Sequence, residues 1–132
     1  GSPLKYRNER YARANNGYNM ILTGGAFLDW EVAFAKYWSD EAERGRALVD
    51  EIFNCEDILL NYVLANGTTS RTVEYIHPAW AIDTSKLSSS AISRDTNQHY
   101  LKREQCLNTF SEIYGLTLKK WEFGNRIDSW DY

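Results

Sequence analysis

Two short groups of residues in this sequence could carry chemistry. The first is the block Asn54-Cys55-Glu56-Asp57, which directly precedes the most apolar segment of the chain, residues 58–65. The second is formed by His99, Arg103 and Cys106, which recur at near-helical spacing further along the chain. Arginine binds phosphate well, and it needs a carboxylate or another anion wherever it is buried. These side chains are therefore the candidates for a functional site.

The first group also has a purely structural explanation. Asparagine is a preferred helix N-cap, and a carboxylate three residues later is close to a capping box, so Asn54 and Asp57 predict the start of a helix. Glu56 and Asp57 would lie in its first turn, where the helix dipole favours negative charge. Residues 58–65 are apolar on all sides, which predicts a buried helix. The neighbouring Cys55 and the matching group around His99 favour a further, functional role.

The second group lies on a helix that we expect over residues 96–114. At 100° per residue, seven side chains of this helix share about 120° of arc. They are His99, Arg103, Cys106, Leu107, Phe110, Ile113 and Tyr114. This stripe predicts that Arg103 faces the protein interior, where it needs a negatively charged partner. The partner could be a structural salt bridge to Glu56 or Asp57, or the phosphate of a bound ligand, and the pattern favours neither.

Composition sets the class of protein. The chain has 132 residues, 43% of them apolar, which suits one domain with its own core. Its net charge of −3 and the lack of a Lys/Arg-rich run argue against a nucleic-acid partner. The sequence contains no transmembrane span, and its polar, charged start is unlike a signal peptide. Gly1-Ser2 is typical of a cloning scar.

Two features point weakly to the secretory route. Cys55 and Cys106 are too few for a disulfide scaffold or a zinc site, but they could form one bridge. A bridge would bring Asn54 and Asp57 close to Arg103 and His99, in one polar cluster between two helices. Asn66-Gly67-Thr68 is an acceptor sequence for N-glycosylation.

The remaining segments complete the expected architecture. Residues 1–17 are expected to form a flexible or partner-dependent lead-in, residues 18–124 the domain, and residues 125–132 an acidic aromatic tail. Helices are expected at 26–38 and 41–53, in addition to those described above. Strands are expected at 18–22, 71–76 and 116–123, which makes the predicted fold class α/β. Residues 79–93, with the serine-rich stretch 85–91, are expected to be a long loop that could serve as a lid or be disordered.

Two of these segments have alternative interpretations. Thr23-Gly24-Gly25 is a turn where the backbone could approach a ligand, or a simple connection between two elements. The expected helix 26–38 carries Phe27, Trp30, Phe34 and Tyr37 at helical spacing. We expect this aromatic stripe to belong to the core, because such stripes are core far more often than ligand platforms.

Four blocks of sequence, in this order, resemble the exostosin-like glycosyltransferases of family 64. They are Met20-Ile21-Leu22-Thr23-Gly24-Gly25-Ala26-Phe27, Asn54-Cys55-Glu56-Asp57-Ile58 with Asn61, Ala65-Asn66-Gly67-Thr68, and Arg103-Glu104-Gln105-Cys106. The resemblance covers roughly residues 18–117, and the combination of blocks is specific although each alone is not. Residues 73–75 and 78–83 look most like the plant branch that transfers glucosamine or N-acetylhexosamine to glycosyl inositol phosphorylceramide.

The resemblance implies a fold, an activity and a location. The fold would be the C-terminal part of a GT-A type nucleotide-sugar domain, with helices packed on a few short strands. The reaction would be retaining transfer of the sugar from a UDP-sugar donor to a glycan or glycolipid acceptor, with Mn²⁺ bridging the diphosphate. The location would be the Golgi lumen, with a membrane anchor outside this chain.

The resemblance also implies roles for individual residues. Asp57 and Arg103 would be catalytic, Asp57 at the cationic anomeric carbon and Arg103 at the leaving phosphate. The sugar-binding residues would be Asn54, Glu56, His99, Thr23 and Gly24. The family's disulfide would correspond to Cys55–Cys106.

One departure from the family limits the expected activity. The chain has no Asp-x-Asp-type acidic motif after an apolar strand, so none of its residues is expected to bind the metal. We therefore expect the chain to represent the acceptor-side half of a catalytic domain that binds UDP and Mn²⁺ weakly, if at all. The alternative is a non-catalytic binding or structural module that keeps the family's helices and disulfide.

Overall fold

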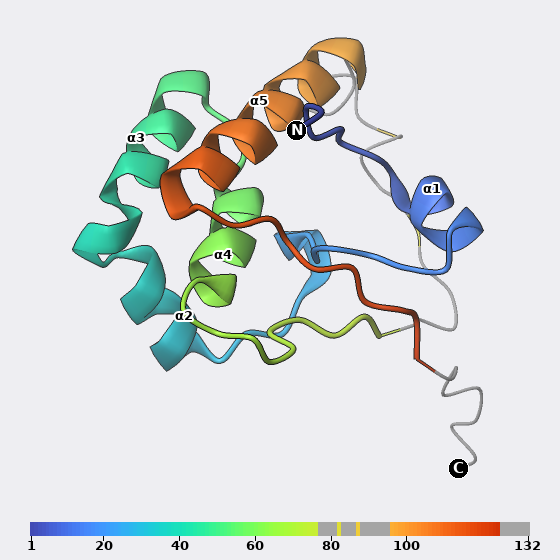
Figure 1. Ribbon diagram of the computed structural model, residues 1–132, viewed down its shortest axis with the longest axis horizontal. Helices are drawn as coiled ribbons and strands as arrows, with labels where there is room; N and C mark the ends of the chain where they lie inside the picture. The colour runs from blue at the N-terminus through green and yellow to red at the C-terminus, as the bar shows by residue number, and fades with distance from the viewer. Residues whose placement is uncertain (77–81, 83–86, 88–95, 125–132) are drawn as a thin grey trace.

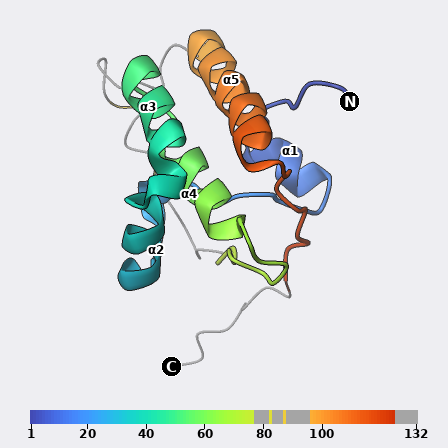
Figure 2. The same ribbon diagram turned by 60° about the vertical axis from the view of Figure 1, so that its left-hand side comes forward.

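The computed structural model describes residues 1–76, 82, 87 and 96–124. Its helices are α1 (Glu9–Ala14), α2 (Trp30–Tyr37), α3 (Glu43–Ile52), α4 (Glu56–Ala65) and α5 (Thr96–Tyr114), with 3-10 turns at Thr23–Gly25 and Asp40–Ala42. Helix α4 contacts α2, α3 and α5, while α3 and α5 also contact each other (Figures 1 and 2). The described part of the chain is therefore a small helical bundle built around α4.

The central helix α4 is buried along most of its length, as its sequence predicts. The residues from Asp57 to Val63 are all buried, whereas Glu56 is exposed. Tyr62 lies against Phe110 of α5, with ring centroids 5.8 Å apart, and its hydroxyl donates to the carbonyl of Leu107 at 3.1 Å. Burial raises the pKa of Tyr62 to about 12, which keeps this donor protonated at physiological pH.

Helix α5 has the bounds and the inward face that the sequence predicts. Its buried residues are Arg103, Cys106, Leu107 and Phe110, all members of the predicted stripe. Because i, i+3 and i+4 positions share one side of a helix, a single stripe can place an arginine and a cysteine against α4 together with apolar neighbours.

The predicted α/β fold class is wrong for the described residues, which contain helices but no strand. The segments 18–22, 71–76 and 116–123 were expected to be strands. They run as extended or irregular chain, and Tyr18 with Trp121 forms one isolated antiparallel bridge. An alternating pattern stabilises a strand only where a neighbouring strand pairs its backbone groups. The helices are therefore not packed on a sheet, and nothing in this architecture supports the expected GT-A fold.

The three expected strands nevertheless meet through their side chains. The ring of Tyr18 lies 5.9 Å from that of Tyr75 and 5.3 Å from that of Phe123, and the last two rings are 5.1 Å apart. The hydroxyl of Tyr18 also accepts a hydrogen bond from the backbone N–H of Tyr75 at 3.1 Å. These segments thus meet through a cluster of three aromatic rings and the single backbone bridge between Tyr18 and Trp121, rather than through a ladder of backbone hydrogen bonds.

The aromatic stripe of residues 26–38 is another incorrect prediction. Phe27 is 98% exposed, Trp30 70% and Phe34 61%, while Tyr37 alone of the four packs against the core. Helix α2 begins only at Trp30, where the Asp29 side chain accepts from the N–H of Val32. The periodicity predicts a helix and one shared face, but it does not say whether that face points inward.

The first residues of the chain include a short helix that the sequence analysis did not predict. Helix α1 is capped by Asn8, whose side chain accepts from the N–H of Tyr11, and Tyr6 is buried. Among the described residues, no helix has both the length and the apolar character that crossing a bilayer requires. The expected loop 79–93 falls outside the described residues except at positions 82 and 87, and the expected tail 125–132 falls entirely outside them.

Gly45 allows α3 to approach α4 and α5 closely. A Cβ atom at this position would lie 2.3 Å from Leu59 Cδ1 and 3.1 Å from the hydroxyl oxygen of Tyr114. We expect Gly45→Ala to lower the free energy of unfolding by about 1–2 kcal/mol, because overpacking of the buried Leu59 outweighs the better helix propensity of alanine. Urea denaturation followed by circular dichroism measures this change. The neighbouring exposed Arg44→Ala is the control, and equal stability of both variants would contradict the close approach.

Candidate functional site

The connection between α3 and α4 turns Asn54 toward α5. Phe53 and Cys55, on either side of it, both adopt left-handed backbone conformations, with φ of 51° and 78°. Asn54 is therefore not the N-cap that the sequence predicts, because Cys55 occupies that position and no side chain caps it. The Asp57 carboxylate instead accepts from the N–H of Ile58 at 2.7 Å. The asparagine side chain is left available for contacts across the helix junction.

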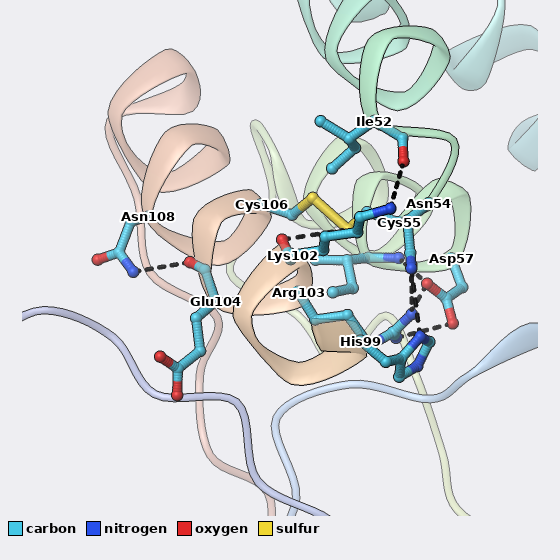
Figure 3. The surroundings of a disulfide bond; sticks show 11 residues. Ile52, Asn54, Cys55, Asp57, His99, Lys102, Arg103, Glu104, Cys106 and Asn108 are labelled. Atoms are coloured by element: carbon cyan, nitrogen blue, oxygen red, sulfur yellow. Dashed lines mark hydrogen bonds and ion pairs between the residues drawn. A yellow bond between two sulfur atoms is a disulfide. The ribbon is translucent and has the colours of Figure 1, made fainter. Parts of the chain in front are cut away.

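A disulfide between Cys55 and Cys106 fixes the start of α4 against α5 (Figure 3). Both cysteines are fully buried, and their Cα atoms are 6.4 Å apart. Cys55 precedes Asp57 by two residues, and Cys106 follows Arg103 by three, about one helical turn. The bridge therefore holds the carboxylate and the guanidinium in one place, as the sequence analysis expected from a bond between these cysteines.

Arg103 and Asp57 form a buried ion pair. Nη2 of Arg103 donates to both carboxylate oxygens, at 3.0 and 2.9 Å, and Nη1 donates to Oδ1 of Asn54 at 3.3 Å. Arg103 is 4% exposed and Asp57 7%. Of the two carboxylates considered as structural partners, Asp57 fills the role, and the exposed Glu56 takes no part in the pair.

The fourth member of this group is His99, one turn before Arg103 on α5. Its Nδ1 lies 3.2 Å from Nδ2 of Asn54. Since Oδ1 of Asn54 accepts from Arg103, the Asn54 amide presents its N–H groups to His99, and Nδ1 must be the acceptor. We call Asn54, Asp57, His99 and Arg103 the polar cluster; Figure 3 shows their side chains converging.

This hydrogen-bond arrangement resists protonation of His99. Burial is the main cause that lowers its pKa below the ordinary value, and the nearby positive charge of Arg103 acts in the same direction. A proton on Nδ1 would also face the N–H groups of Asn54. Relieving that conflict by rotating the amide would take Oδ1 away from Arg103. His99 is thus held neutral, as a hydrogen-bond acceptor, next to a fixed positive charge.

Tyr6 is a member of the site that the sequence analysis missed. The guanidinium carbon of Arg103 lies 4.6 Å from the centroid of the Tyr6 ring, and Tyr6 in turn contacts Tyr100 edge-on at 4.9 Å. Burial raises the pKa of Tyr6, although the charge of Arg103 opposes the rise. A tyrosine in a polar, charged segment gave no periodic signal by which it could have been found.

Arg103 keeps its charge and part of its hydrogen-bonding capacity. Burial disfavours the charge, but the hydrogen bonds and negative charge of Asp57 outweigh that effect and raise the pKa of Arg103. Its Nε–H group is buried and has no hydrogen-bond partner among the described residues. The cluster therefore combines a fixed guanidinium, a paired carboxylate, a neutral imidazole and an amide, groups that together can orient a hydroxylated or anionic ligand.

Asn61 links the Thr23-Gly24 turn to the start of α4. Its side chain exchanges two hydrogen bonds with the backbone of Ile21, at 3.1 and 2.8 Å, and donates to the carbonyl of Asp57 at 2.8 Å. Thr23 and Gly24 are exposed and make no described hydrogen bond to the polar cluster itself. The signal for Asn61 was a lone polar residue within a fully apolar helix, which must find hydrogen-bond partners when buried.

The remaining predicted site residues lie away from the polar cluster. Asn66 ends α4, and its side-chain amide contacts the carboxylate of Glu41, so glycosylation at this position would have to displace that contact. Within the part of the chain that the structure describes, no group of three or more His, Cys, Asp or Glu side chains could hold a metal ion.

Titration of His99 provides a direct check of the cluster. The pKa of His99 is lower in the folded than in the unfolded chain. In the pH range between these two pKa values, the folded state therefore binds fewer protons than the unfolded state. His99 should therefore cost no stability above about pH 6.5, the ordinary histidine pKa, and should reduce it as the pH falls toward the folded-state pKa. NMR titration of the His99 ring in the native chain and in urea measures both values. A native pKa above that in urea would contradict the assigned acceptor role.

Comparison with known proteins identifies the family of the chain that carries this disulfide-linked cluster. The sequence model of the glycosyl transferase family 64 domain matches residues 4–130. The chain therefore belongs to glycosyl transferase family 64, as the four sequence blocks indicated. No solved structure matches it significantly.

Individual relatives narrow the position of the chain within the family. It is 64% identical over 131 residues to glucosamine inositolphosphorylceramide transferase 1 of Oryza sativa, and 56% identical over 131 residues to the protein of the same name from Arabidopsis thaliana. These matches cover 99% and 97% of the chain, but only 18% and 17% of the relatives. Exostosin-1c of Danio rerio is 32% identical over 116 residues, which are 86% of the chain and 15% of the relative. The chain thus spans less than a fifth of the length of the relatives it matches.

Proposed function

We propose that, within a protein of its relatives' length, this chain supplies the acceptor-side half of the catalytic domain of a retaining glycosyltransferase, including residues that contact the donor sugar. The enzyme would move glucosamine or N-acetylhexosamine from a UDP-sugar to a glycolipid such as an inositol phosphorylceramide. The observation that carries this proposal is the polar cluster, in which two helices and a disulfide hold Asp57 and Arg103 together out of water. The names of the plant relatives support the choice of sugar and acceptor.

The chemistry of sugar transfer suits these groups. A retaining transfer develops positive charge at the anomeric carbon and negative charge on the departing diphosphate. Asp57 would stabilise the first charge and orient the sugar, and Arg103 would stabilise the second. The Nε–H of Arg103 has no partner among the described residues but is buried, so it would serve as a donor to a phosphate oxygen only in a state in which the surroundings of the cluster open. Asn54 and His99 would position the sugar hydroxyls, with Glu56, Thr23 and Gly24 at the edge of the site.

The metal and the cellular location are proposals for the longer protein. Mn²⁺ is expected at the diphosphate, but the described residues offer no group of ligands for it, so its ligands would come from outside this part of the chain. We assign it no step here. Lumenal Golgi location agrees with a disulfide, which persists in oxidising compartments, and with the sequon at Asn66. An anchor outside residues 1–132 would hold the protein at the membrane.

The test replaces the matching segment of the rice protein by this chain and measures transfer from UDP-N-acetylglucosamine and UDP-glucosamine to an inositol phosphorylceramide glycolipid. We expect an active chimera in which Asp57→Asn or Arg103→Lys lowers kcat/KM by roughly 100-fold or more, as removal of charge-stabilising groups does elsewhere. Lys102→Gln, an exposed neighbour on α5, is the matched control. NMR of the product gives the anomeric configuration. Full activity of the Asp57 and Arg103 variants, or inversion at the anomeric carbon, would refute the assignment.

The second candidate is a non-catalytic binding or structural module. It is favoured by one observation, namely that Asp57 already neutralises Arg103 in a closed, buried pair. Under this alternative a correctly folded chimera would be inactive while the parent rice protein is active. For the chain alone, both candidates lead us to expect little or no saturable binding of UDP in the presence of Mn²⁺ by calorimetry.

A further inference from the structure

Helix α2 exposes a set of large aromatic side chains that the proposed site does not use. We call Phe27, Trp30, Phe34 and Trp38 the aromatic face. Their exposed fractions are 98%, 70%, 61% and 59%. The last three are spaced i, i+4 and i+8, so they form one ridge along the helix, and the rings of Phe34 and Trp38 are 6.2 Å apart.

The side of α2 next to this face, rather than the opposite side, packs within the bundle. Ala33 is buried there, and Tyr37 packs against the core. Both ribbon views place α2 at the margin of the bundle (Figures 1 and 2). The aromatic face is thus an outer surface of the described structure, made of the residue types that dominate protein interfaces.

Exposure of this kind needs an explanation. Single exposed apolar residues are normal on protein surfaces, but a contiguous set of large ones marks an interaction site. A helix with aromatic residues on both its buried and its exposed sides is suited to burial between two bodies of protein. The bundle supplies only one of them.

Charge narrows the choice of occupant. Asp29 and Glu31, both exposed, flank the most exposed end of the face, and residues 17–35 contain no lysine or arginine. Positive charge lies at the other end of the face, where Lys36 is in the last turn of α2 and the guanidinium carbon of Arg46 is 5.2 Å from the centroid of the Trp38 ring. An anionic lipid headgroup would be repelled by these carboxylates, and a second copy packed about a two-fold axis parallel to α2 would bring them toward their own equivalents. The charge favours a partner with an apolar centre and basic residues around it.

The relatives are much longer than this chain, and the rest of their polypeptide could contain such a partner surface. The 131 matched residues make up 18% of the rice protein, so more than four-fifths of that polypeptide lies outside the matched segment. A surface in the same polypeptide is present at high effective concentration, which favours contact within one molecule over contact between molecules. We propose that in a protein of that length the aromatic face packs against polypeptide outside residues 1–132, through an apolar patch with a basic rim.

Site-specific photo-crosslinking in the rice chimera tests this proposal. The photoreactive amino acid p-benzoylphenylalanine replaces Trp30 in one variant and Phe34 in another. A third variant carries it in place of Leu101, which is 67% exposed on α5 and serves as the matched control. After irradiation, mass spectrometry identifies the crosslinked peptides. The same labels at the aligned positions of the rice protein repeat the test without exchange of any segment.

The expected result is a crosslink from positions 30 and 34 to peptides of the rice protein outside the exchanged segment, at least 10-fold more abundant than from position 101. Crosslinks to the same segment, in the same or another copy, would overturn the proposal. So would adducts with lipid, the absence of any adduct, or equal yields from position 101. The readout needs no sugar donor and no activity, so it fails or succeeds independently of the proposed function.

Discussion

Replacing Arg103 by methionine should lower the free energy of unfolding by about 3–5 kcal/mol, the usual cost of leaving one member of a buried ion pair without its partner. Asp57 is 7% exposed, and its carboxylate would keep only the short hydrogen bond from the N–H of Ile58. Tyr6 would also lose the cation against which its ring packs. Urea denaturation monitored by circular dichroism measures the loss.

Two further variants separate charge from packing. In Arg103→Met with Asp57→Asn, no buried charge remains, so we expect much of the lost stability to return, because the cost of a broken pair lies in the unpaired partner. Arg103→Lys keeps the charge but loses the separate Nη1 donor to Asn54 and the planar group that lies over the Tyr6 ring, and it should fall between wild type and Arg103→Met. A double variant as unstable as the Arg103→Met single variant would show that packing by the arginine side chain, rather than charge compensation, sets its contribution.

Removing the disulfide should cost a comparable amount. The bond between Cys55 and Cys106 joins residues separated by 51 positions in the sequence. Closing a loop of that size stabilises the native state by about 4 kcal/mol in the chain-entropy model, and measured values are often lower. We expect Cys55→Ala with Cys106→Ala to lose stability of this order, since both sulfur atoms are buried and the two alanines introduce no polar group.

Reduction gives the matched control. Dithiothreitol should shift the urea midpoint of the wild-type chain toward that of the double alanine variant and leave the variant itself unchanged. Because the bridge also positions Asp57 against Arg103, the effects of removing the bridge and of Arg103→Met should not add. Free thiols in the native, unreduced chain would contradict the bond, and additive losses would show that the ion pair forms without it.

Local pattern determined much of the helical framework. The apolar run at 58–65 predicts a helix that is buried on all sides. The stripe at 96–114 predicts a helix and its inward side, because apolar residues that repeat with the 3.6-residue helical period lie on one face. The same stripe predicts that Arg103 needs an anion beside Asn54 and Asp57. Motif order indicated the family, which the match over residues 4–130 confirmed.

Tertiary structure decided what periodicity cannot express. Alternation at 18–22, 71–76 and 116–123 predicted strands, but a strand needs continuous pairing with another strand. These segments share one isolated backbone bridge and otherwise meet through aromatic rings. Spacing defined one face for Trp30 and Phe34, but only the packing of α2 shows that this face points outward.

Some residues of the polar cluster could be predicted from local sequence patterns, and others join it only in the folded structure. Local sequence patterns indicated which charged and polar residues share one face of α5 and which precede α4. Tyr6 joined them only through the path of the folded chain, since no short-range pattern connects it with Arg103. Asn54 left its predicted capping position because the left-handed residues beside it turn its side chain toward His99 and Arg103. The type of a residue determines which groups its side chain can bind. Backbone geometry and long-range packing determine which of those groups lie within contact distance in the folded chain.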